Sequence, residues 1–174
     1  MVAGREDFEA FVAARYDALL RTAYLLTGDH HDAEDLLQQT LVKAVGAWGR
    51  ITGDPEPYVR TILVRQNVSR WRGRRWRELH TADLPEVGVS DGGSDDRIAL
   101  HRALGLLAPR QRAVIVLRYY EDLTEAQTAS VLGIALGTVK SQVRDGLGRL
   151  RALLPDLELE GDPVSSSAGA RPPR

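Results

Sequence analysis

The sequence predicts an all-α protein made of two small helical domains joined by a flexible acidic linker. Apolar residues recur at spacings of three and four along both halves of the chain, a pattern typical of helices with one buried face. Residues 81–96 contain three glycines, one proline and five acidic residues but no basic residue, which is typical of a linker. We therefore expect domains at 1–80 and 97–154, with a disordered tail at 155–174 where serines, prolines and mixed charge gather.

Two antiparallel helices are expected between residues 16 and 51. The segment Thr27-Gly28-Asp29 separates two runs with apolar periodicity, so it predicts the end of one helix and the start of the next. On the second run, Asp32, Asp35 and Gln39 recur at i, i+3 and i+7 and form an acidic stripe near the helix start. Carboxylates in a first turn are stabilising by about 0.3–1 kcal/mol through the helix dipole alone, so the stripe does not by itself require a partner.

Charge is distributed unevenly along the first half. Residues 1–57 hold five basic and ten acidic residues, whereas residues 58–80 hold seven arginines and one glutamate, interleaved with Tyr58, Trp71 and Trp76. Guanidinium groups bind phosphate bidentately and aromatic faces stack on bases, so this stretch suits a nucleic-acid strand. The alternative is a solvated basic helix end whose tryptophans cap the core.

The second half predicts a helix-turn-helix. Thr124 and Gln127 have the spacing of a capping box, and Gly133 is suited to end the helix that follows. A further helix then carries an apolar face from Val139 to Leu154, opposite a face rich in hydrogen-bond donors. Such a helix is typical of those that enter the DNA major groove, although a bundle end with a solvated basic face would give the same pattern.

Composition excludes several classes of protein. The chain has no cysteine, which removes disulfides, thiolate metal sites and cysteine nucleophiles. It also lacks a glycine-rich phosphate loop, and the adjacent His30 and His31 point in different directions on a helix, so we expect no metal, no cofactor and no enzymatic activity. With neither a secretory signal nor an apolar run of membrane-spanning length, we expect a cytoplasmic protein without membrane insertion.

Two segments resemble RNA polymerase sigma factors of the extracytoplasmic-function (ECF) group of the sigma-70 family. Residues 32–40, DAEDLLQQT, followed by Ala47-Trp48, resemble the region 2.2 signature, and residues 123–142 resemble the region 4 signature. Residues 24–29 and 71–77 are most similar to the SigE-like actinobacterial subgroup. LuxR-like regulators share a similar helix-turn-helix but have no such N-terminal half.

The resemblance implies roles for named residues. It implies that the first domain binds the clamp helices of the polymerase largest subunit through Asp32, Asp35, Gln38 and Gln39. For the −10 element, with residues 52–57 as the pocket for a flipped base, it implies Trp48, Tyr58, Arg60, Arg65, Asn67, Arg70, Trp71, Arg74 and Arg75. For the −35 element in the major groove, it implies Arg118, Thr138, Lys140, Ser141, Gln142 and Arg144.

The sequence departs from the family pattern at several positions. Arg65 stands where the family commonly has asparagine, and Asn67 follows two positions later. Ala135 replaces a Ser or Pro at the start of the reading helix and removes a cap worth about 0.5–2 kcal/mol. Asp145 stands where a basic residue is common, with Arg149 and a cytosine amine as its candidate partners. Gly146 and Gly148 each weaken the helix by about 1 kcal/mol relative to Ala.

The sequence thus predicts a sigma factor that binds core RNA polymerase, including its flap, and promoter DNA, with an anti-sigma factor as a further candidate partner. The alternative is a stand-alone helix-turn-helix regulator, which would need only residues 97–154. A protein-only interaction module would explain the acidic stripe but not the arginine-rich stretch.

Overall fold

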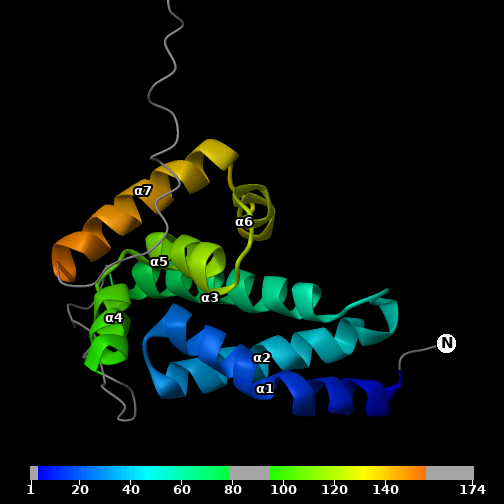
Figure 1. Cartoon of the computed structure of the whole chain (residues 1–174). Coiled ribbons are helices and arrows are strands. Elements are labelled where there is room, and N and C mark those ends of the chain that lie inside the picture. Colours follow the sequence, from blue (N-terminus) through cyan, green and yellow to red (C-terminus); the bar gives the residue numbers. More distant parts are fainter. Residues whose placement is uncertain (1–3, 79–94, 156–174) are drawn as a thin grey trace, which may run out of the picture.

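The computed structural model describes residues 4–78 and 95–155, and this part of the chain is helical and contains no strand (Figure 1). In chain order the elements are α1 (Arg5–Thr27), α2 (His30–Ala47), the 3₁₀ turn η1 (Trp48–Arg50), α3 (Glu56–Glu78), α4 (Asp95–Gly105), α5 (Pro109–Ile115), the π-helical turn η2 (Val116–Tyr120), α6 (Glu125–Leu132) and α7 (Leu136–Leu153). The all-α prediction is therefore confirmed. Most of the expected linker and all but the first residue of the expected tail lie outside the described residues, and α4 begins at Asp95, within the last two residues assigned to the linker.

The first two helices form the expected hairpin. Gly28 has φ +84° and its N–H donates to the Tyr24 carbonyl at 2.8 Å, which ends α1 in a left-handed cap. The Asp29 carboxylate then accepts from the Asp32 backbone N–H at 2.9 Å and caps α2. Local chemistry at residues 28 and 29 therefore fixes the reversal between the helices.

The third helix packs on this hairpin with one apolar face. Val59, Leu63 and Val64 of α3 are fully buried, whereas Arg65 is exposed and Arg60 and Arg70 are partly buried. Below the start of α3, the Trp48 ring packs edge-on against Phe8, with ring centroids 4.9 Å apart. These contacts bury the N-terminal core and leave the polar faces of α2 and α3 for interactions.

The helix-turn-helix forms as the sequence predicts. Thr124 Oγ1 accepts from Gln127 N at 3.2 Å, and Gln127 Oε1 accepts from Thr124 N at 2.8 Å, so both halves of the capping box are present. Gly133 ends α6 with φ +64°, and Ala135 begins α7 without a side-chain cap. The buried residues of α7 include Val139, Leu147 and Leu150, which confirms the expected apolar face.

The two halves of the chain pack against each other (Figure 1). Ala113 of α5 and Val116 and Leu117 of η2 are buried in the same apolar cluster as Leu36 and Leu63 from the first half. Figure 1 shows α5 lying along α3, with α4 beside the end of the α1–α2 pair. The sequence pattern indicated two helical units but gave no sign of this shared core.

A buried arginine ties α5 to the end of α1. Arg112 Nη1 donates to the carbonyls of Leu26 and Thr27, both at 3.2 Å, and Nη2 donates to the Gly105 carbonyl at 2.6 Å. The carbonyl end of a helix carries partial negative charge, so a cation placed there is favourable. Burial lowers the pKa of Arg112, but an arginine stays charged in a protein.

An aromatic stack joins α4 to α1. The His101 and Tyr24 rings are nearly parallel, at 5°, with centroids 4.1 Å apart, and His30 stacks on Tyr24 at 4.5 Å. His101 Nε2 is buried without a hydrogen-bond partner. Burial lowers the pKa of His101, and the positive charges of Arg112 and His30 lower it further, while a hydrogen bond with the Tyr24 backbone opposes this shift.

None of the described helices has the length and apolar character needed to span a membrane.

We predict that Gly146 and Gly148 of α7 respond oppositely to alanine. A Cβ added at Gly148 meets nothing within 4 Å, so Gly148→Ala should raise the free energy of unfolding by about 0.5–1 kcal/mol through helix propensity. A Cβ at Gly146 would lie 3.1 Å from the buried Ile115 Cγ1. Gly146→Ala should therefore not raise the free energy of unfolding, because the cost of displacing Ile115 offsets the gain in helix propensity. Urea unfolding of both variants measures the difference, and equal stabilisation would contradict the close approach of α7 to α5.

We predict that His101 makes the protein less stable in acid. Its pKa is lowered in the folded protein, so the unfolded chain binds the proton more readily near the ordinary pKa of about 6.5. The contribution to stability is complete above that pH and declines as the pH falls through it. Urea unfolding at pH 7.5 and 5.5 should show a smaller loss for His101→Phe, which keeps a ring in the stack. His31→Gln, at an exposed position, serves as the control. This role is refuted if the free energy of unfolding of His101→Phe falls between the two pH values by as much as that of the wild type.

Candidate nucleic-acid and protein interfaces

The acidic stripe lies on α2 and is partly neutralised by α3. Arg70 Nη1 donates to the Asp32 carbonyl at 3.1 Å, and Nη2 lies 3.2 Å from Asp32 Oδ1 and 4.0 Å from Asp35 Oδ2. Gln38 and Gln39 are exposed one turn further along α2. The structure thus brings the four candidate residues to one side of α2, and Arg70 of α3 pairs with the two aspartates among them.

Exposed apolar residues extend this surface. Val42 and Val45 of α2 are 70% and 48% exposed, although both are large aliphatic residues. They follow Gln38 at i+4 and i+7, so they continue its face of the helix. The sequence analysis did not single them out, although their position away from the buried Leu36, Leu37 and Thr40 was a signal that they face solvent. A polar stripe that continues into exposed aliphatic residues is typical of a protein-binding face.

Two of the candidate −10 residues are buried and offer no surface to DNA in this structure. Trp48 is 7% exposed because it packs against Phe8 and Phe11 in the core, and Asn67 is 9% exposed on the inner side of α3. A contact of Trp48 or Asn67 with DNA stays a prediction, and it would require these side chains to become exposed. The aromatic ending of the α2 segment belongs to the core, and the departure from the family pattern near Asn67 coincides with a buried position.

Other candidates on α3 are accessible or engaged with protein atoms. Tyr58 is exposed at the start of the helix, and Trp71 is half-buried near its end. Arg60 lies between Glu56 at 3.0 Å and Glu121 at 2.7 Å. Arg65 Nε donates to the Val131 carbonyl at 2.9 Å. The side chains of Arg74 and Arg75, and of Trp76, lie outside the described residues.

The candidates for −35 recognition lie along α7, with one exception. Lys140 is 3.9 Å from Glu125 of α6, the Ser141 hydroxyl donates to the Thr138 carbonyl at 3.0 Å, and Gln142 is half-buried. Arg144 has a side chain that is 78% exposed and pairs with Asp145 at 3.2 Å. Of the two candidate partners of Asp145, Arg149 donates instead to Gln111 at 3.4 Å, and the cytosine amine stays a prediction.

Arg118 is the exception. Its Nη1 donates to the Leu123 carbonyl just before the cap of α6, and its Nε is buried. The guanidinium therefore fastens the turn between η2 and α6. In this structure Arg118 holds the turn before α6, and its direct contact with the −35 element stays a prediction.

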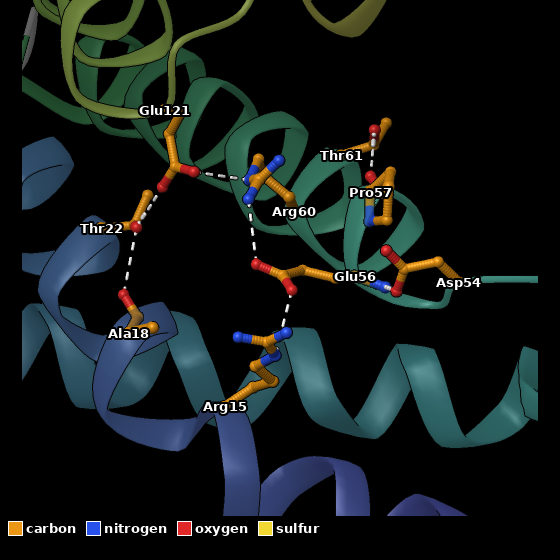
Figure 2. Close-up of polar contacts among 9 residues, drawn as sticks. All are labelled: Arg15, Ala18, Thr22, Asp54, Glu56, Pro57, Arg60, Thr61 and Glu121. Carbon is orange, nitrogen blue, oxygen red and sulfur yellow. Dashed lines mark hydrogen bonds and ion pairs between the residues drawn. The ribbon is translucent and has the colours of Figure 1, made fainter.

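A chain of ion pairs joins the two halves, and the sequence analysis missed it. Figure 2 shows Glu121 between Arg60 of α3 and Thr22 of α1, with Glu56 linking Arg60 to Arg15. Arg15 Nε lies 3.0 Å from Glu56 Oε2. These partners are up to 99 residues apart in sequence, so no local pattern signals their meeting.

Among the described residues, no group of three or more His, Cys, Asp or Glu side chains is arranged to hold a metal ion.

Comparison with known proteins accounts for both halves. The family model described as Sigma-70 region 2 matches residues 11–77, and the one described as Sigma-70, region 4 matches residues 97–150. An RNA polymerase sigma-E factor of Streptomyces avermitilis is 40% identical over 158 residues, which cover 88% of each chain. The ECF RNA polymerase sigma factor SigL of Mycobacterium tuberculosis is 34% identical over 164 residues, which cover 85% of this chain and 91% of the relative.

A solved structure of a sigma factor is also similar to this chain. The sigma factor RpoE in its co-crystal structure with the anti-sigma factor NepR from Bartonella quintana is similar with a TM-score of 0.73 at 29% identity. The similarity covers 87% of this chain and 98% of that one. With both sigma regions present in order, and with relatives above 30% identity along most of their length, this chain belongs to the ECF group of sigma-70 family RNA polymerase sigma factors.

Proposed function

We propose that this chain binds core RNA polymerase and directs promoter-specific transcription initiation by recognising −10 and −35 DNA elements. The observation that carries the proposal is the presence of both sigma regions in one chain, in the order and extent of its relatives. A stand-alone regulator would use only the C-terminal half, and the match to region 2 over residues 11–77 disfavours it. The protein acts in the cytoplasm, where polymerase and chromosome are accessible, and it catalyses no reaction of its own.

The polymerase-binding surface is the face of α2 that carries Asp32, Asp35, Gln38 and Gln39. Asp35 and the glutamines supply charge and hydrogen-bond acceptors, and Val42 and Val45 supply exposed apolar area beside them. An apolar patch next to polar groups combines burial with orientation, as protein interfaces require. A basic helical partner fits this surface best.

Promoter DNA is bound at two places. Four residues of α3 contact the −10 strand by phosphate pairing and base stacking: Tyr58, Arg60, Arg65 and Trp71. The exposed face of α7 contacts the −35 duplex, and its buried Val139 and Leu147 anchor it to the rest of the domain. An anti-sigma factor is a further partner, as for the similar RpoE.

We expect run-off transcription from a promoter library to start at new sites only when core polymerase and this protein are both present. Asp35→Lys should weaken core binding about tenfold or more, because it places a positive charge on a surface that fits a basic partner. Asp35 is suited to this test because its side chain is 47% exposed, so its reversal leaves the core intact.

Glu34→Lys is the matched control, since it makes the same charge change one residue away on an exposed position of α2. Core affinity measured by fluorescence anisotropy should be near wild type for Glu34→Lys and reduced for Asp35→Lys. Absence of new start sites with the wild-type protein would overturn the proposed function. Equal affinities of the two variants would overturn the assigned surface alone.

We expect Arg144→Ala to relax selectivity at one position of the −35 element. A guanidinium that reads a base contributes about 1–3 kcal/mol of discrimination there, whereas loss of a phosphate contact lowers affinity for all sequences alike and reduces the salt slope by about 1. Binding of a −35 duplex library, with every position varied, separates the two cases. Arg110→Ala on α5, also exposed, is the control and should leave the preference unchanged. A uniform loss for Arg144→Ala would contradict base reading.

A further inference from the structure

The exposed face of α7 carries a basic and an acidic residue that pair at adjacent positions. Arg144 Nε donates to Asp145 Oδ1 at 3.2 Å, and the two side chains are 78% and 47% exposed. The ordinary helical partner of Asp145 would be Arg149, four residues further along the chain. Arg149 instead donates to Gln111 of α5 at 3.4 Å, so the carboxylate pairs with the residue proposed to read the −35 element.

This ion pair contributes little to the stability of the fold. Water and salt screen a pair that is so exposed, and its two side chains lose conformational freedom when they meet. Aspartate is also a poorer helix former than alanine, and position 145 lies in the middle of α7. Binding therefore explains the pair better than folding does.

The pair occupies one end of the Arg144 guanidinium and leaves the other end open. Nε is bound to Asp145, whereas among the described residues neither Nη1 nor Nη2 of Arg144 has a hydrogen-bond or ion-pair partner. A guanidinium with two open nitrogens can bind O6 and N7 of guanine bidentately in the major groove. Because Asp145 restricts the rotation of the long side chain, the open nitrogens keep a defined direction before DNA arrives.

The next turn of α7 leaves Arg144 uncovered. Side chains of a helix lean toward its N-terminus, so a side chain at position 148 would lie over the turn that carries Arg144. Gly148 has no side chain, and a Cβ built there would meet nothing within 4 Å. A base pair can therefore approach Arg144 and Asp145 closely from the solvent side.

The charge of Asp145 has a separate effect on DNA binding. A carboxylate on a face that approaches DNA repels phosphates, whatever the sequence of the duplex. We infer that Asp145 is a positioning residue for −35 recognition, which holds the Arg144 guanidinium so that Nη1 and Nη2 bind guanine, and whose charge weakens binding to other sequences. Both effects raise the ratio of specific to non-specific affinity. The inference rests on the proposed function for its −35 assignment.

Asp145→Ala distinguishes this role from a structural one. The full chain is tested on a −35 duplex library with every position varied. The wild type should prefer guanine by about 5- to 150-fold at the position that Arg144 reads, and Asp145→Ala should reduce this preference about threefold or more. Affinity for a duplex of random sequence should change in the opposite direction and rise about two- to fivefold, because a negative charge is removed from the face next to the phosphates. A purely structural role would lower affinity for all sequences alike.

Asp145→Asn is the conservative variant, since its amide oxygen still accepts a hydrogen bond from Arg144 Nε but carries no charge. It should retain more of the guanine preference than Asp145→Ala does. Alanine is the better helix former, so Asp145→Ala should unfold at the temperature of the wild type or above, and a lost preference cannot then come from unfolding. Asp122→Asn is the charge control, at an exposed position whose φ of +51° asparagine tolerates, and it should leave the base preference unchanged.

A double-mutant cycle shows whether Asp145 acts through Arg144. In the Arg144→Ala background, Asp145→Ala should not change the preference at that position any further. A further loss there, or a loss at another position alone, would overturn the positioning role. A wild-type preference that Asp145→Ala leaves intact would overturn this inference alone, whereas a wild type without preference at any position would overturn the −35 assignment as well. Run-off activity of the wild type, measured separately, decides the proposed function.

Discussion

The structure depends on α3, a helix that packs apolar residues against the core and also carries arginines that need polar partners. Its inner face buries Val59, Leu63 and Val64 against α1 and α2, so its position is set by apolar packing. Arg60, Arg65 and Arg70 are then held at fixed places, and each finds an anionic or carbonyl partner within the chain. The buried residues fix the helix, and the arginine contacts then fasten it to α2, η2 and α6.

The reading helix depends on a different set of supports. Ala135 provides no cap, and α7 contains glycines, so its own sequence gives it little intrinsic stability. Packing compensates, because Val139 and Leu150 are buried and Gly146 lets the helix approach Ile115 closely. Arg118 fastens the preceding turn. The helix is thus positioned from beneath by tertiary contacts, which leave the exposed face available for DNA.

Sequence reasoning succeeded where the determining interaction is local. The capping box at Thr124, the left-handed Gly133 and the reversal at Gly28 each depend on atoms a few residues apart, so their patterns are legible in the chain. It failed where partners are distant. The family resemblance assigns Trp48 to the −10 strand, yet Phe8 and Phe11, near the start of α1, pack against its ring. Glu121 carries no local signature at all, because its partners come from α1 and α3.

The contact between the halves combines apolar packing with charged hydrogen bonds made by arginines. Val116 and Leu117 bury apolar surface in a cluster that both halves share. Exposing that surface to water would lose its hydrophobic contribution to stability. The arginine contacts differ, because phosphate offers Arg60 and Arg65 the same charge complementarity that Glu121 and the end of α6 provide. The two halves are thus held together by an apolar cluster beneath α5 and η2 and by arginine contacts at its edge, and no local pattern in the sequence signals either of them.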